Sequence, residues 1–278
     1  MKDIPVYDNH VHMNPLGGNI ETLKEFEKAG GTGITLVTLP YSGVSDPGDL
    51  LRSYEVTISM AARARECTGL EINVAVGPYP VLLLPLAEHL GIEKAENVMK
   101  AGMKMAADLV ASGRADAIGE IGRPHFSVPD DISEASDRIL AHGMELASAN
   151  CCPVIIHSES GSPEMMRELS DMARSSSLDP GMVIKHFSPP LVHSGENHGL
   201  MPSIPASRKA IREALEKGDR FMLETDHIDD PKRPGAVMPI TTVPKRILGM
   251  MSSGELSEET AWKIGRDIPE RMFGQGKH

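Results

Sequence analysis

The chain has 278 residues, of which 40% are apolar and 24% charged, and its formal net charge is -11. This composition is typical of a soluble globular protein and excludes a disordered chain, and the length suits a single (β/α)8 barrel. The longest apolar stretch, Val81–Leu86, is far shorter than the roughly 20 residues that a membrane-spanning helix needs.

The negative net charge does not indicate the basic face with which proteins bind nucleic acid. A small molecule or a nucleic acid can still be the substrate, but we expect no stable nucleic-acid complex. Residues 1–5 show no signal-peptide core, and the three cysteines (Cys67, Cys151 and Cys152) form neither a disulfide framework nor a zinc ribbon. We therefore expect a reduced, cytoplasmic protein that does not bind membranes. The sequence leaves the oligomeric state open.

Short β-rich runs alternate with longer helical stretches along the chain. Most of these runs are continuously apolar, as strands covered on both faces are. A weaker run near Gly199–Ile204 predicts an irregular seventh strand. The other strands are predicted over Val6–His12, Gly33–Leu39, Glu71–Val76, Ala115–Ile121, Pro153–His157, Met182–Phe187 and Arg220–Thr225. The alternation predicts an α/β fold in which residues 1–278 form a single TIM-type barrel.

Helical patterns fill the gaps between these runs. Ile92–Ser112 repeats its apolar residues at close to a 3.6-residue period, which predicts an amphipathic helix. Ser162 is a predicted N-cap ahead of Pro163, and Gly218 is predicted to end the helix over Ser207–Lys217. Three segments rich in Pro or Gly are interpreted as loops on the catalytic face, with plain surface connections as the alternative: Tyr41–Leu50, Gly77–Gly91 and Ser188–Pro205.

Residue types that bind metals fall at the ends of five predicted strands. His10 and His12 lie two apart on the first strand, so both side chains point the same way and can reach one ion. Glu120 lies between two glycines at the end of an apolar strand, where an unpaired carboxylate is costly. Three further strands end in a ligand: His157, His186 and Asp226. Together, at the face where barrel active sites lie, these residues predict a site for one or two divalent ions.

Five short motifs follow one another along the chain: His10-x-His12, Gly119-Glu120-Ile121-Gly122, Val154-Ile155-Ile156-His157-Ser158, His186-Phe187-Ser188 and Glu224-Thr225-Asp226. From residue 6 to Gly274, their order and placement resemble those of the TatD-like metal-dependent hydrolases of the amidohydrolase superfamily. The resemblance implies a TIM barrel with one or two divalent metals and, in the best-known members, deoxyribonuclease or other phosphodiesterase activity. By position, it implies that His10, His12 and Asp226 hold the first metal, that His157 and His186 hold the second, and that Glu120 bridges the two.

The chain departs from this family directly after the second motif. TatD-like nucleases continue with Leu-Asp-Tyr, whereas this chain continues with Arg123-Pro124-His125, which bears on the substrate rather than on the metals. Arg123 is predicted to contact an anionic group of the substrate. Lys232 and Arg233 could hold a phosphate or carboxylate, with a solvated basic pair as the alternative. The sequence leaves four roles open: His125, Glu159, His193 and His198.

The predicted ligand set defines the expected chemistry. A water held between two divalent ions loses a proton near neutral pH and becomes a nucleophile. Asp226 is the predicted catalytic residue, because it can accept that proton and return it to the leaving group. Zn is the favoured metal, with Mn, Fe, Co, Ni or weakly bound Mg as alternatives.

The family resemblance favours a phosphodiesterase of the nuclease type. Hydrolysis of an amide, lactone or carboxylic ester is the alternative, because the same superfamily core performs it. A metal-binding or scaffold protein without activity would need its open coordination positions to be blocked, and nothing in the sequence suggests that.

Overall fold

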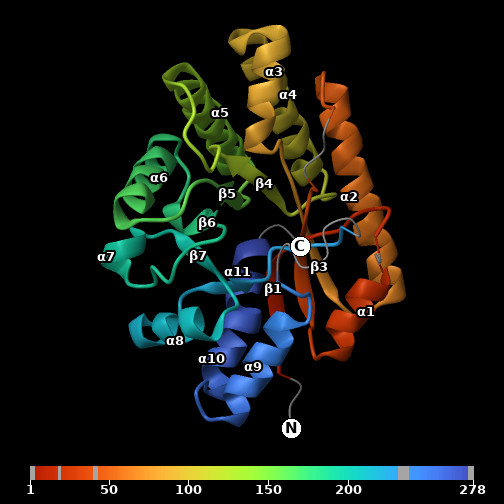
Figure 1. Cartoon of the computed structure of the whole chain (residues 1–278), viewed down its shortest axis with the longest axis vertical. Helices are drawn as coiled ribbons and strands as arrows, with labels where there is room; N and C mark the ends of the chain where they lie inside the picture. Colours follow the sequence, from red (N-terminus) through yellow and green to blue (C-terminus); the bar gives the residue numbers. More distant parts are fainter. Residues whose placement is uncertain (1–3, 18–19, 40–42, 231–237, 275–278) are drawn as a thin grey trace.

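The computed structural model describes residues 4–17, 20–39, 43–230 and 238–274. Within these ranges, nine strands form one parallel sheet in the order β8-β7-β6-β5-β4-β3-β2-β1-β9. The sheet curls at the centre of the molecule, and helices surround it (Figure 1). The strands are β1 (Tyr7–His12), β2 (Gly33–Val37), β3 (Glu71–Val76), β4 (Ala117–Gly122), β5 (Val154–His157), β6 (Val183–Lys185), β7 (Met201–Pro205), β8 (Met222–Glu224) and β9 (His227–Ile228).

The first and eighth strands lie side by side and close the curl. The backbone N–H of Thr225 donates to Oδ1 of Asp8 at 3.0 Å, and the Thr225 hydroxyl donates to Oδ2 at 2.7 Å. Strand β9 then pairs with β1 beside this contact. The predicted α/β fold with a TIM-type barrel is therefore confirmed, and the weak seventh run is β7.

Helices follow most of the strands. The helices are α1 (Ile20–Lys28), α2 (Pro47–Cys67), α3 (Leu83–Leu90), α4 (Ile92–Ala111), α5 (Asp130–Ala149), α6 (Pro163–Ser175), α7 (Ser194–Asn197), α8 (Arg208–Lys217), α9 (Thr242–Ser252), α10 (Glu258–Trp262) and α11 (Ile268–Phe273). Short 3-10 or π turns cover η1 (Pro80–Leu82), η2 (Pro180–Met182) and η3 (Lys263–Asp267). In the part of the chain that the structure describes, no helix is long and apolar enough to cross a membrane.

The predicted helix ends are confirmed by their caps. The Ser162 hydroxyl accepts from the N–H of Met165 at the start of α6, and the Ser207 hydroxyl accepts from Ala210 at the start of α8. Gly218 follows α8 with a φ of 149°, a backbone conformation that suits glycine. The amphipathic pattern from Ile92 corresponds to α4.

One predicted loop is wrong. The segment Gly77–Gly91 contains η1 and α3 instead. Leu83 and Leu86 are buried, so packing against the core stabilises the helix. Pro85 lies in the first turn of α3, where a missing N–H costs no intrahelical bond.

The other two predicted loops are partly wrong. The segment Ser188–Pro205 includes α7 and β7, and the segment Tyr41–Leu50 ends in the first turn of α2, which begins at Pro47. Tyr41 and Ser42 lie outside the described residues. The strand ends also shift: β6 stops at Lys185, so that His186 follows the strand rather than belonging to it.

The strands carry an apolar outer face and a partly polar inner one. On β2, Ile34 and Leu36 pack in the outer hydrophobic cluster with residues of the helices, and Ile72 does the same on β3. Because side chains alternate along a strand, Thr35 and Asn73 point into the barrel. Both are buried and hydrogen-bonded there, so the interior holds polar groups that reach toward the strand ends.

Candidate metal centre

His10 and His12 project from the end of β1 into the open end of the barrel. Both are buried, and their Nε2 atoms lie 3.1 Å apart. Nδ1 of His12 lies 3.2 Å from the carbonyl oxygen of Val37, so that nitrogen donates and the Nε2 lone pair faces inward. Burial lowers the pKa of both imidazoles, most strongly that of His10. Both rings are therefore neutral at pH 7, the state that a metal requires.

Glu120 reaches the same point because β4 is irregular. Strict alternation would place Glu120 on the face of Ile118, which packs outward. The pairing of β4 with β5 shifts register between Gly119 and Ile121, so both isoleucines pack in the outer cluster. The Glu120 carboxylate then points to the histidines, with only 3% of its side chain exposed.

The Glu120 carboxylate is central to the cluster. Its Oε1 lies 3.8 Å from Nε2 of His12, and its Oε2 lies 3.7 Å from Nε2 of His10. Oε2 also lies 3.1 Å from Nδ1 of His157 and 4.0 Å from Nε2 of His186. Burial alone would raise the pKa of Glu120, but the hydrogen bond from His157 brings it below its usual value. Glu120 therefore presents a charged carboxylate to all four imidazoles.

His186 follows β6 and is held from behind by a buried carboxylate. Its ring stacks on that of His10 with centroids 3.7 Å apart. Its Nδ1 lies 2.9 Å from Oε1 of Glu224, although the present ring orientation makes no hydrogen bond there. The same oxygen accepts from the N–H of Phe187 at 2.9 Å, and Oε2 accepts from the Ser203 hydroxyl. The Glu224 carboxylate therefore lies within hydrogen-bond distance of His186 and is the group that can orient its ring.

A chain of hydrogen bonds extends this support across the barrel interior. Ser203 Oγ accepts from Asn9 Nδ2 at 3.0 Å, and Asn9 Oδ1 accepts from the Thr35 hydroxyl at 3.4 Å. Tyr7 joins the chain through Thr35 at 2.9 Å and through Nδ2 of Asn73 at 2.7 Å. All five residues are buried. The network therefore fixes the Glu224 carboxylate from the side opposite the metal ligands.

Asp226 follows β8 and lies at the more exposed edge of the cluster. Its backbone has a φ of 52°, a left-handed conformation that aspartate tolerates. Its Oδ1 lies 3.7 Å from Nε2 of His12, and 21% of its side chain is exposed. Burial, followed by the carboxylates of Glu224, Glu120 and Asp8, raises the pKa of Asp226 to about 9. A bound cation reverses this preference, because it favours the carboxylate.

His157, at the end of β5, faces Glu120 on one side and His125 on the other. Its Nε2 lies 3.0 Å from Nδ1 of His125, and the Tyr79 ring packs edge-on with centroids 5.0 Å apart. The sequence left the role of His125 open, and the structure brings it to the edge of the cluster.

The donor set fits a divalent metal. Two groups of three residues have ligand atoms within 4.8 Å of one another: His10, Glu120 and His186, and His10, His12 and Asp226. Nitrogen and oxygen ligands around a tetrahedral zinc lie about 3.4 Å apart, close to the spacings of the cluster. His157 belongs to neither group, but it contacts the shared carboxylate. Which residues hold which ion therefore stays a prediction.

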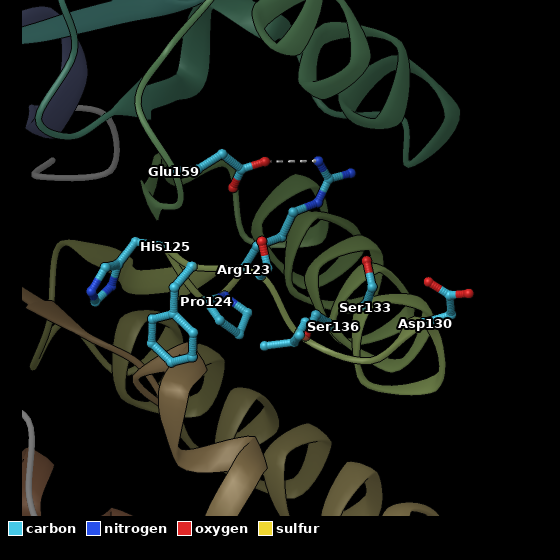
Figure 2. A pocket seen from close by; sticks show the side chains of 10 residues that line it. Arg123, Pro124, His125, Asp130, Ser133, Ser136 and Glu159 are labelled. Atoms are coloured by element: carbon cyan, nitrogen blue, oxygen red, sulfur yellow. Dashed lines mark ion pairs between the residues drawn. The ribbon is translucent and has the colours of Figure 1, made fainter.

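Of the predicted substrate contacts, the structure describes Arg123, which is held by ion pairs outside the cluster. Arg123 Nε donates to Asp137 at 2.6 Å, and its Nη1 lies 3.4 Å from Glu168. Nη1 also lies 4.0 Å from Glu159, the ion pair that Figure 2 marks. The structure does not bring its guanidinium to the cluster, and its anion contact stays a prediction. Lys232 and Arg233 lie outside the described residues.

Two histidines of open role have positions outside the cluster. Nδ1 of His193 accepts from the N–H of Gly195 and caps α7, and His198 ends that helix with a φ of 49°. Glu224 was missed by sequence reasoning, although the available signal was the one that singled out Glu120. That signal is a carboxylate at the end of an apolar strand.

A barrel with imidazoles and carboxylates at its strand ends belongs to the class that binds metals at its catalytic face. The family described as "TatD related DNase" matches residues 7–274, and the chain belongs to that family of hydrolases. It is 34% identical to an uncharacterized protein of Methanocaldococcus jannaschii over 276 residues, which cover 98% of this chain and 97% of the relative.

Solved structures agree with the fold. The TatD homolog YjjV of Escherichia coli matches with a TM-score of 0.68 and 18% identity, covering 98% of this chain and 99% of that one. An uncharacterized amidohydrolase of Saccharomyces cerevisiae matches with a TM-score of 0.57 and 11% identity, covering 97% and 88%. At these identities the likeness shows a shared fold.

Metal uptake is expected to release protons at pH 7. The carboxyl of Asp226, with its raised pKa of about 9, is protonated in the metal-free protein and must lose that proton to bind a cation. His10, His12 and His186 are already neutral and release none. Glu224, with its pKa raised to about 8, loses a further proton when a cation favours its carboxylate form. Zinc titration by calorimetry in two buffers of different ionisation enthalpy should therefore show more than one proton released, and about one fewer in Asp226→Asn. Affinity should rise from pH 7 toward pH 9, and failure to take up zinc would contradict the metal centre.

Replacement of Glu224 by glutamine tests the support behind His186. The amide keeps the size and a partner for Ser203, but it cannot stabilise the imidazole as a carboxylate does. Metal affinity should fall by roughly 10- to 100-fold, the usual effect of losing such a partner. Competition with a chelator and the absorption spectrum of bound cobalt measure this, with Glu258→Gln on α10 as the control. Unchanged affinity and spectrum would show that Glu224 does not orient His186.

Proposed function

We propose that the chain is a divalent-metal-dependent hydrolase that cleaves phosphodiesters, with deoxyribonuclease activity included. The observation that carries the proposal is one cluster of four imidazoles and two carboxylates at the C-terminal ends of the strands. The description of the family supports the phosphodiester bond. Zinc is the proposed metal, because imidazole and carboxylate ligands suit it, with Mn, Fe, Co, Ni or Mg as alternatives.

The proposed role of each residue follows from its exposure to solvent. Divalent ions bound here supply Lewis acidity and lower the pKa of a coordinated water toward neutrality. Asp226 lies at the more exposed edge, where its carboxylate accepts the proton of the attacking water and donates it to the leaving group. Glu120, almost fully buried, remains unprotonated and balances the positive charge of the ions. The carbonyl of Val37 orients the imidazole of His12, and Glu224 lies 2.9 Å from Nδ1 of His186, where its carboxylate can accept a hydrogen bond once the ring turns toward it.

Hydrolysis of an amide, lactone or carboxylic ester is the second candidate. The observation that favours it is the run Arg123-Pro124-His125 in the place of the nuclease motif Leu-Asp-Tyr. The ion pairs of Arg123 with Asp137 and Glu168 also occupy a guanidinium that a phosphodiester would otherwise attract. A metal-activated water attacks carbonyl and phosphoryl groups alike, so the cluster itself does not discriminate.

A cytoplasmic location is part of the proposal. Cys67, Cys151 and Cys152 are free thiols, which a reducing compartment preserves.

A substrate panel tests the bond type. Metal-loaded protein should hydrolyse bis(p-nitrophenyl) phosphate and short single-stranded DNA, and a chelator should abolish both reactions. DNA cleavage should weaken at high salt, because the contacts with phosphates are screened. Hydrolysis of lactones, amides or p-nitrophenyl acetate, without cleavage of any phosphodiester, would overturn the proposal in favour of the second candidate.

Two variants separate the proton acceptor from the ligand that balances charge. Asp226→Asn keeps one coordinating oxygen but cannot accept a proton, so turnover should fall about 100-fold or more while metal content falls little. Glu120→Gln should lower the metal content itself, because a neutral amide cannot balance two cations. Elemental analysis and turnover, measured on the same preparations, reveal the contrast. Near-full activity of Asp226→Asn at full occupancy would move the base elsewhere, with His125 and Glu159 first to test.

A further inference from the structure

A cavity of about 410 Å³ opens beside the metal centre. It lies between the loop after β4 and the start of α5, with Glu159 across from them (Figure 2). His125 belongs both to its lining and to the edge of the metal cluster, through its 3.0 Å contact with His157. A substrate bound at the metals can therefore extend past His125 into this cavity.

The positive charge of the cavity wall is already neutralised. Arg123 is the one lysine or arginine among the lining residues, and its guanidinium pairs with Asp137, Glu168 and Glu159. Asp130 adds a further carboxylate to the lining. Three carboxylates thus pair with the one guanidinium and Asp130 adds a fourth to the surroundings of the cavity, so the local field favours a cation over an anion.

The start of α5 does not reverse this field. A helix N-terminus attracts anions through its free N–H groups, but the first turn of α5 holds Asp130 and Asp131. The Asp131 carboxylate already accepts from the N–H of Ile132 at 2.9 Å. The carboxylates of the first turn therefore occupy the N-terminus of α5, where a phosphate would otherwise bind.

The lining also includes an exposed aromatic ring. Phe126 is 45% exposed, and its ring packs at right angles to that of His125 with centroids 5.0 Å apart. Aromatic faces attract cations, above all quaternary ammonium groups. Carboxylates and an aromatic ring together therefore favour an organic cation over a plain hydrocarbon.

We infer that this cavity binds a positively charged organic group of the substrate, such as an alkylammonium, while the adjacent phosphodiester lies at the metal centre. The inference rests on the proposed function and narrows its substrate class. A small diester of an amino alcohol fits the cavity, whereas a polynucleotide brings a further negative charge with each linkage. The cavity thus acts as the specificity site of the enzyme.

Three matched substrates test this assignment. They are the p-nitrophenyl phosphodiesters of choline, of its uncharged isostere 3,3-dimethylbutanol and of 3-hydroxypropanoate, and the p-nitrophenyl carboxylic esters of the same three charge types form a second series. The zinc-loaded full chain should show the highest kcat/KM with the cation and the lowest with the anion. Each charge step should change kcat/KM on the order of fivefold, and the steps should shrink at high salt.

Variants place the preference in the cavity. Glu159→Gln should reduce the ratio of the choline to the dimethylbutyl substrate. Glu258→Gln removes the same charge on α10, far from the cavity, and should leave the ratio unchanged (Figure 1). Phe126→Leu should also lower the ratio of the choline to the dimethylbutyl substrate, because it removes the aromatic face but keeps an apolar side chain of similar size. Ratios that none of these variants changes would overturn the assignment.

The outcomes separate this inference from the proposed function. Cleavage of the diesters without a charge preference, or with the anion preferred, overturns the cavity assignment alone. Preference for the anion would also support an anion contact by Arg123. Cleavage of the carboxylic esters alone, with the cation preferred, overturns the phosphodiesterase and supports the cavity. If neither series is hydrolysed, both are wrong.

Discussion

The Glu120 carboxylate is buried at the end of the barrel, and a charge in such a place is costly unless other groups compensate it. Four imidazoles surround it, and burial keeps three of them neutral, so they offer lone pairs rather than positive charge. Neutral donors and buried carboxylates are fully compensated only when a cation lies among them. Metal binding at the barrel end should therefore also stabilise the folded protein.

The polar barrel interior follows from this requirement. A purely apolar interior would leave His186 without a partner at Nδ1, and its ring could rotate away from the cluster. Glu224 prevents this only if its own burial is compensated, which Ser203, the Phe187 N–H and the chain through Asn9 provide. Burial still raises the pKa of Glu224 to about 8, so a positive charge on the metal side favours the carboxylate form. The hydrogen-bond network around Glu224 and the metal centre therefore depend on each other.

The strand ends could be predicted from sequence because a parallel barrel brings every C-terminal end to one face. That geometry is independent of distance along the chain, and it brings Nε2 of His12 to within 3.7 Å of Oδ1 of Asp226. The direction of Glu120 could not be derived, because alternation assigns it outward and only the irregular pairing of β4 turns it inward. The ion pairs of Arg123 were also beyond reach, since Asp137 and Glu168 come from helices whose packing no local pattern specifies.

Exposure across the cluster shows from which side a substrate arrives. His10 and His186 are closed off by the interior network, whereas the side chains of His157 and Asp226 are 15% and 21% exposed. The accessible edge therefore runs from the end of β5 to the end of β8, and His125 extends it toward the loop after β4. The metal ligands lie at the ends of strands, which fix their positions. The loop after β4 supplies Phe126 and the start of the cavity. A change in the loop after β4 alters what enters without disturbing the ligands, which is how one barrel accommodates different substrates.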